Sequence, residues 1–426
     1  MVGDHDPETD DSTEPVGAAG GPGSAGMTST ATPRPLSCPE CGATVLDRWR
    51  CVCGSPLRFA DPPVPAGSPP APDSFDTRHG LWAFEEFLAV GDDRFDRVTL
   101  GEGMTPLVDA DGSVETRTGS ADTDGWNAAF KLEYVFPTGS FKDRGATTTL
   151  TRARELGVNR VVEDSSGNAG AAIATYAARA GIDAAVYVPA DVKATKLRAI
   201  RRAGAEPVRV EGSRADVTAA CVAALGPEGG EGDGTASATV DEGAAWYASH
   251  AWNPAFFEGT ATVAYEIAVQ RGWAAPDALV MPLGHGTLFL GAYWGFRRLE
   301  RAGWIDDVPR LFGAQAAGIA PIVRSLHGAA AADPEGRVNG VADGIQIAEP
   351  VRHAEILDAI AATDGDALAV TESAVERELD RLHTAGFYTE PTCAVAPAAL
   401  RALREQGVLD ADADVVLPLT GSGLKS

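Results

Sequence analysis

The sequence predicts an α/β protein in which two doubly wound parallel-sheet domains follow an N-terminal zinc-ribbon-like module. Short apolar strands alternate with helices from Ala128 onward, which is typical of parallel βαβ units. Four of the six cysteines lie close together, between positions 38 and 53. A chain of 426 residues, 44% of them hydrophobic, is long enough to bury two or three cores.

The N-terminal part of the chain divides into a tail and a cysteine-rich segment. Residues 1–33 contain almost no large apolar side chains, so we expect a disordered acidic tail. Residues 34–60 contain C-P-E-C-G and C-V-C-G, two cysteine knuckles that each end in a glycine. Four thiolates in this pattern predict a closed, structural zinc site. Because the second knuckle is shorter than C-x-x-C, free thiols or a degenerate ribbon remain as alternatives. The expected zinc ligands are Cys38, Cys41, Cys51 and Cys53.

The remaining chain is expected to form the main fold. Residues 61–75 are rich in proline and are predicted to be a linker. Residues 76–141 and 256–426 are assigned to a large domain, and residues 142–255 to a small domain with a surface insertion at 227–243. We also expect a helix at Leu81–Leu88 and a surface loop at 109–125.

The alternating pattern predicts seven strands and seven further helices. The expected strands are Ala128–Tyr134, Arg160–Glu163, Ala184–Val188, Pro207–Val210, Leu279–Pro282, Arg310–Ala314 and Val415–Leu417. The expected helices are Asp143–Leu156, Ala169–Ala180, Ala194–Ala203, Arg214–Leu225, Thr260–Arg271, Gly286–Ala302 and Ala394–Gln406.

The charge and composition of the chain limit the kinds of molecule that it can bind. A net charge of -25 argues against nucleic acid and anionic membranes, since both require a basic face. No run of 18 apolar residues indicates a membrane span. The isolated Cys221 and Cys393 are typical of a reducing compartment, and no signal peptide is recognised, so we expect a cytoplasmic protein.

Lys142 is the first candidate catalytic residue. It follows the turn Pro137-Thr138-Gly139-Ser140 and precedes an apolar-periodic helix. A helix N-terminus disfavours a cation, and a neutral lysine amine can form a Schiff base. Taken alone, the same pattern is also typical of a surface lysine in a turn.

Three further loops follow predicted strands and precede helices or end the fold. Ser165-Ser166-Gly167-Asn168 places small polar groups at a helix N-terminus, which suits a carboxylate or phosphate, or a plain serine cap. Gly284-His285-Gly286-Thr287-Leu288 has the form of a phosphate-binding loop. Thr420 begins a glycine-hydroxyl turn, T-G-S-G-L-K, for which a disordered tail is the alternative. One lysine, one asparagine, one phosphate loop and one hydroxyl turn are the groups that a protein supplies to pyridoxal phosphate.

These motifs resemble those of the threonine synthase family. P-T-G-S-F-K-D-R-G, S-S-G-N-A-G, the G-x-G-T loop and T-G-S-G-L-K occur in the family's order. The earlier segments C-V-C-G-S-P-L and L-G-E-G-M-T-P-L resemble the same family, so that the resemblance covers residues 38–425. The resemblance implies a fold-type-II pyridoxal phosphate enzyme, related to the tryptophan synthase β chain. It also implies a carbon–oxygen lyase of amino-acid biosynthesis that converts O-phosphohomoserine to threonine and phosphate, as a monomer or homodimer.

The resemblance also implies roles for individual residues. Lys142 would hold the cofactor as a Schiff base and move protons, Phe141 would pack beside the ring, and Asn168 would bind the 3′ oxygen. Thr420 would face the pyridine nitrogen. The cofactor phosphate would be held by Gly284, His285, Gly286, Thr287 and Leu288, and the substrate carboxylate by Ser165, Ser166 and Gly167.

Two parts of the sequence depart from the family pattern, and one of them concerns the substrate. A segment of the form N-S-x-N-P-x-R normally grips the substrate phosphate, but here Ala251 and Phe256 occupy the serine and arginine positions. Phe136 also stands where the family has asparagine. A serine or threonine dehydratase, or a β-replacement enzyme acting on an activated serine, is therefore the alternative. A non-catalytic regulatory protein is disfavoured, because Lys142, Asn168 and Thr420 are all present.

Overall fold

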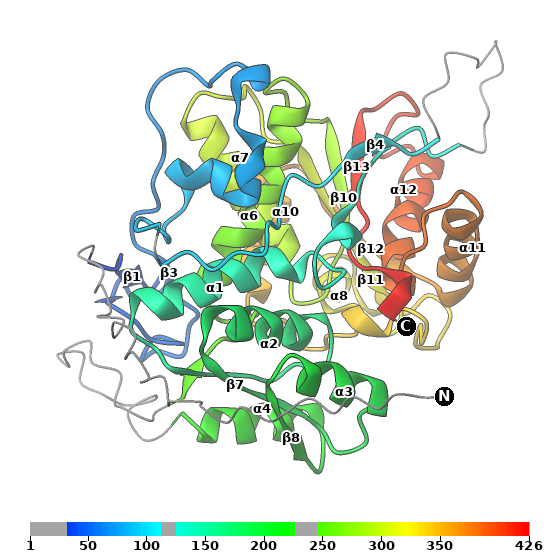
Figure 1. Cartoon of the computed structure of the whole chain (residues 1–426). Helices are drawn as coiled ribbons and strands as arrows, with labels where there is room; N and C mark the ends of the chain where they lie inside the picture. The colour runs from blue at the N-terminus through cyan, green and yellow to red at the C-terminus, as the bar shows by residue number, and fades with distance from the viewer. Residues whose placement is uncertain (1–31, 95, 112–124, 226–244, 426) are drawn as a thin grey trace, which may run out of the picture.

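Two sheets with helices around them organise the main body of the protein (Figure 1). The computed structural model describes residues 32–94, 96–111, 125–225 and 245–425. The predicted insertion 227–243, nearly all of the tail 1–33 and most of the loop 109–125 lie outside these described residues. No described helix is long and apolar enough to cross a membrane.

The larger sheet has six strands in the order β12-β11-β10-β13-β5-β4. Its strands are parallel except for β4, which pairs antiparallel with β5 at one edge. The central strands β10 and β13 are completely buried, which explains their unbroken apolar sequences. The strands are β4 Leu107–Asp109, β5 Ala129–Lys131, β10 Ala278–Pro282, β11 Arg310–Ala316, β12 Asp366–Val370 and β13 Val415–Pro418.

The smaller sheet has four parallel strands in the order β8-β7-β6-β9. Its helix α2 lies between this sheet and α1 in Figure 1. The strands are β6 Arg160–Glu163, β7 Asp183–Pro189, β8 Glu206–Val210 and β9 Trp246–Tyr247. The parallel α/β class predicted from the sequence is therefore confirmed.

The α-helices connect the strands, and α1 to α4, α7 and α12 begin within one residue of their predicted starts. They are α1 Lys142–Glu155, α2 Asn168–Ala180, α3 Ala194–Arg202, α4 Arg214–Ala223, α6 Pro254–Gln270, α7 Thr287–Arg301, α8 Pro321–His327, α9 Ala329–Ala332, α10 His353–Ala362, α11 Glu372–Thr384 and α12 Val395–Glu405. Short 3-10 helices are η1 Pro72–Ser74, η2 Thr77–Phe87, η3 Glu133–Val135, η4 Asp343–Ile345, η5 Pro391–Ala394 and η6 Gly423–Lys425.

Helix α6 is the buried centre of this arrangement and packs against both α1 and α7. A Cβ atom at Gly259 would lie 1.7 Å from the carbonyl oxygen of Arg144, so only glycine permits α1 to approach this closely. At Gly291 of α7, a Cβ atom would lie 2.2 Å from Oγ1 of Thr260. These contacts fix the start of α1 relative to the start of α7.

The N-terminal module is a small antiparallel sheet of β1 Leu36–Ser37, β2 Thr44–Val45 and β3 Arg58–Phe59. It packs on the main body rather than standing apart. The ring of Trp49 lies edge-on to those of Tyr247 and Trp252, with centroids 5.5 and 5.0 Å apart. The indole of Trp246 donates to Asp47 at 2.8 Å. The module therefore contacts β9 and the segment between β9 and α6.

Several local predictions were wrong. The strand expected at 128–134 ends at Lys131, because the chain then turns through η3. The helix expected to begin at Thr260 begins at Pro254, where Asn253 caps the N–H of Ala255. The segment 81–88 forms most of a kinked 3-10 helix, and β4, β9, β12 and α8 to α11 were not predicted.

Candidate active site

Lys142 is the first residue of α1, and its amine lies 3.2 Å from the hydroxyl oxygen of Thr287 at the start of α7. The amine also lies 4.2 Å from the centre of the Phe141 ring. Loss of hydration lowers the pKa of Lys142 to about 8, and this effect is partly opposed by the acidic side chains of Glu163 and Glu390 when they are ionised. The sequence predicted a more neutral amine from the helix dipole, and the structure adds burial as a cause.

The glycine-rich loop between β10 and α7 forms a backbone cradle. Gly286 has φ +79°, and a Cβ atom there would lie 2.6 Å from the side chain of Ile356. The first N–H groups of α7 have no intrahelical acceptor, so they are available to an anion. The buried Nδ1 of His285 has no hydrogen-bond partner among the described residues. The loop therefore offers several unpaired donors next to the amine of Lys142.

The second loop opens α2 at the end of β6. The N–H of Gly167 donates to the hydroxyl of Ser165 at 3.3 Å, and both serines are partly exposed. A Cβ atom at Gly170 would lie 1.9 Å from the carbonyl oxygen of Ser165, so the loop folds tightly over the helix. Asn168 donates from its side-chain amide to Glu390 at 3.0 and 3.1 Å.

The C-terminal turn pairs with the turn that precedes Lys142. The N–H of Phe141 donates to the carbonyl of Thr420 at 3.0 Å, and the N–H of Ser422 donates to the carbonyl of Gly139 at 2.9 Å. The hydroxyl of Thr420 lies 3.5 Å from the sulfur of Cys393. Thr420 is thus brought beside the start of α1, and the alternative of a disordered tail is wrong for residues up to Lys425.

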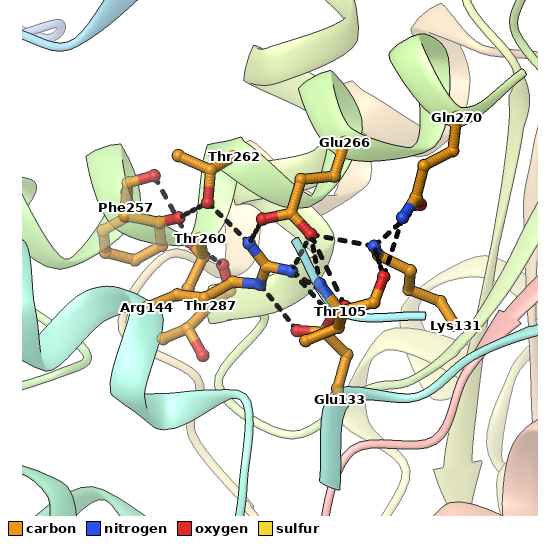
Figure 2. A network of polar contacts seen from close by, with 11 residues as sticks. Thr105, Lys131, Glu133, Arg144, Phe257, Thr260, Thr262, Glu266, Gln270 and Thr287 are labelled. Atoms are coloured by element: carbon orange, nitrogen blue, oxygen red, sulfur yellow. Dashed lines mark hydrogen bonds and ion pairs between the residues drawn. The ribbon is translucent and has the colours of Figure 1, made fainter. Parts of the chain in front are cut away.

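A buried ion network behind α1 holds the lysine-bearing helix in place (Figure 2). Arg144 donates to Glu133 at 2.6 and 2.8 Å and to Glu266 at 2.5 and 2.7 Å. Lys131 donates to the same Glu266 at 2.8 Å. All four side chains are fully buried, and their two positive and two negative charges balance. Thr105 joins the network through its hydroxyl to Glu133 at 2.7 Å.

The segment that departs from the family pattern is also placed by the structure. Phe256 is fully buried against Gly145 of α1, where a Cβ atom would lie 2.1 Å from the Phe256 ring. Phe256 is therefore a packing residue between α1 and α6. Ala251 is buried as well. Next to them, Nδ1 of His250 lies 2.8 Å from Oε1 of Glu163, the last residue of β6.

The four cysteines of the N-terminal module converge. Their sulfur atoms all lie within 4.8 Å of one another, with Cys38–Cys53 at 3.5 Å and Cys41–Cys51 at 3.4 Å. Gly42 and Gly54 have φ +71° and +91°, which explains the glycine after each knuckle. A tetrahedral zinc with Zn–S bonds of about 2.3 Å needs sulfurs about 3.8 Å apart, so this donor set matches the ion.

Glu163, His250 and Glu390 were not predicted as site residues. Glu163 was recognised only as the end of a strand, and His250 only as part of the divergent segment. Glu390 lies in a loop without periodicity, and it is held by its own N–H, which donates to the carbonyl of Gly421 at 2.9 Å. Only Glu163 could have been recognised as a site residue from the sequence, because an acidic residue at the end of a buried strand needs a partner.

This chain is similar to known proteins over most of its length. The model of the family described as "Pyridoxal-phosphate dependent enzyme" matches residues 98–421. The threonine synthase of Methanocaldococcus jannaschii is 33% identical over 91% of this chain and 92% of its own length. That of Methanosarcina acetivorans is 35% identical over 81% of this chain and 80% of its own.

A solved structure shows the same fold at lower sequence identity. The processed form of threonine deaminase isoform 2 from Solanum lycopersicum superposes with a TM-score of 0.56 at 20% identity, covering 77% of this chain and 85% of that one. The family match covers most of the chain, and the two threonine synthases cover 91% and 81% of it. The chain therefore belongs to the pyridoxal-phosphate dependent enzyme family and, within it, to the threonine synthase family.

Proposed function

We propose that this lyase converts O-phosphohomoserine and water to threonine and phosphate. The observation that supports this most directly is the amine of Lys142, 3.2 Å from Thr287 at the N-terminus of α7. A lysine with a lowered pKa and an anion-binding loop thus share one site. The curated relatives that span most of the chain bear the name threonine synthase.

The residues present suit pyridoxal phosphate. The unpaired donors of the loop 284–288 would hold its phosphate, and Asn168 would donate to its 3′ oxygen. Phe141 would pack beside the ring, and Thr420 would present a neutral hydroxyl to the ring nitrogen. When bound, the cofactor supplies an electron sink for the α carbon of an amino acid.

The substrate would be oriented by groups at the start of α2. We propose that Ser165, Ser166 and Gly167 hold its carboxylate through hydroxyl and N–H groups at a helix N-terminus. Lys142 would take up and return protons at its Nζ atom. The buried network around Arg144 would hold Lys142 in position next to the loop at Thr287.

A second candidate function is a dehydratase or β-replacement reaction on serine or threonine. Ala251 and Phe256 favour it, because both are buried and neither can bind a phosphate group.

One assay separates the two functions. Purified enzyme loaded with cofactor is supplied with O-phosphohomoserine, and phosphate and threonine are measured. The same preparation is supplied with serine and threonine, and 2-oxo acid is measured. Stoichiometric phosphate and threonine support the first function. Oxo-acid release without phosphate release rejects it in favour of the second.

We also propose that the cysteine cluster binds one structural zinc ion, that the chain divides into the domains predicted from the sequence, and that it acts as a monomer or homodimer. The four-thiolate donor set supports the zinc proposal. Metal analysis of the purified protein, with one zinc per chain expected, tests it. Two zinc ions per chain, or none, would contradict it.

A further inference from the structure

A buried carboxyl–imidazole pair lies beside the proposed active site. Nδ1 of His250 and Oε1 of Glu163 are 2.8 Å apart, and Glu163 has no exposed surface. The other oxygen of Glu163, Oε2, is buried without a hydrogen-bond partner in the part of the chain that the structure describes. Because the contact uses Nδ1, the other ring nitrogen of His250, Nε2, remains available to a bound molecule.

The pair lies between the groups that carry the proposed chemistry. The rings of His250 and His285 are edge-on, with centroids 5.2 Å apart, so the pair adjoins the phosphate loop. Glu163 is two residues before Ser165, so it also adjoins the loop at the start of α2. Lys142 is close enough for its charge to act on both members of the pair.

The charged groups around the pair come from several elements. Lys142 on α1 and Arg214 on α4 oppose a positive charge on His250, and so does His285 when protonated. Asp164 on the loop after β6 opposes a negative charge on Glu163, whereas Arg214 and Lys142 favour one. Burial raises the pKa of Glu163 well above its usual value and lowers that of His250. These effects favour a pair without net charge, which holds one titratable proton.

We propose that His250, positioned by Glu163, is the proton-transferring catalytic residue for the leaving group and the incoming water. Neither residue was predicted to act in catalysis. In this reaction the γ carbon of the substrate first loses an oxygen, and water later adds to the β carbon. The departing oxygen therefore needs a proton, and the attacking water must later give one up. One group near the distal end of the substrate that can both donate and accept a proton would serve both steps.

The protons balance over the two steps, given the proposed function. When the γ C–O bond breaks, the departing oxygen keeps the electron pair and takes a proton from Nε2 of His250, while Glu163 passes its proton to Nδ1. The pair then has a charge of -1. When water adds, its oxygen bonds to the β carbon and its proton goes to Nε2, and Nδ1 returns a proton to Glu163. In a dehydratase, the departing oxygen would leave as water by the same first transfer.

Two substitutions test the proposal in the cofactor-loaded enzyme. His250→Asn keeps a polar side chain but cannot transfer a proton, and we expect kcat to fall about 100-fold or more with KM within threefold. Glu163→Gln can still accept from Nδ1, and we expect kcat to fall and its dependence on pH to flatten. Each is assayed with whichever of O-phosphohomoserine, serine or threonine the wild type consumes.

A second measurement requires no turnover. Nitrogen NMR spectra of histidine-labelled holoenzyme are recorded from pH 5.5 to 9, with His250→Asn giving the assignment. We expect the His250 signals to titrate in the wild type and to stop titrating in Glu163→Gln. An exposed pair of the same kind, His327 with Asp366 at 2.6 Å, provides the control His327→Asn, which should leave kcat unchanged.

The outcomes distinguish this proposal from the proposed function. If the wild type forms 2-oxo acid but no phosphate, the threonine synthase reaction is rejected, and the two variants are judged on oxo-acid formation. The proposal for His250 is overturned if His250→Asn retains kcat within threefold while keeping its cofactor absorption. It is also overturned if the His250 signals do not titrate, or titrate equally in Glu163→Gln.

Discussion

The side-chain amide of Asn168 donates to both carboxylate oxygens of Glu390, at 3.1 and 3.0 Å, and joins the start of α2 to the loop before η5. Glu390 is also held against the C-terminal turn, because a Cβ atom at Gly421 would lie 2.2 Å from its carboxyl carbon. Its negative charge raises the pKa of Lys142 against the larger effect of burial. Glu390 thus orients the side chain of Asn168 and also raises the pKa of Lys142.

Replacing Glu390 with glutamine should lower the pKa of Lys142 below its wild-type value of about 8. The carboxylate stabilises the protonated amine, so its loss favours the neutral form. The pH dependence of cofactor uptake by the apoenzyme, followed by visible absorption, should shift its midpoint downward. Glu376→Gln, an exposed residue of α11, is the control. An unchanged midpoint in Glu390→Gln would show that the two groups are not coupled.

The wild-type apoenzyme should take up the cofactor at a rate that rises with pH up to about 8 and then levels off. The neutral amine is the reactive form, and a pKa of about 8 instead of 10.5 leaves about one-tenth of it neutral at pH 7. Lys142→Ala should show no lysine-bound absorption band at any pH. A rate that continues to rise to pH 10 would mean that the amine has an ordinary pKa.

Replacing Arg144 with alanine should lower the free energy of unfolding by about 3–5 kcal/mol, because Glu133 and Glu266 would be left buried with less compensating charge. Urea denaturation followed by circular dichroism measures this change. Arg337→Ala, which removes an exposed ion pair with Glu335, should change stability by less than about 1 kcal/mol. Equal effects of the two substitutions would exclude a structural role for the network.

Removing metal with a chelator should destabilise the N-terminal module without loss of the cofactor absorption band. The cysteine cluster lies in that module, whereas Lys142 and the loop at Thr287 lie in the main body. We also expect a higher KM, since Trp49 packs on Trp252, two residues from His250. Thermal denaturation, visible spectra and substrate titration check these points together. Loss of the cofactor absorption band in proportion to metal loss would contradict a purely structural role for the metal.

The sequence predicted the parallel α/β class and the strand-to-helix loops, because these depend on local periodicity and on glycine. Lys142 and Thr287 lie together as expected for a shared site. The sequence did not reveal Glu390 or the pair of Glu163 and His250, since each acts through a partner far along the chain. It also could not show that Phe256 fills the space beside Gly145.

The pairing of the Gly139–Phe141 turn with Thr420 and Ser422 has a consequence for biosynthesis. Lys142 leaves the ribosome long before the segment that completes the surroundings of its helix. Domains assembled from such distant segments close late, and their closure is slow. We therefore expect nascent chains that stop before residue 415 to be unable to retain the cofactor, so that loading follows translation rather than accompanying it.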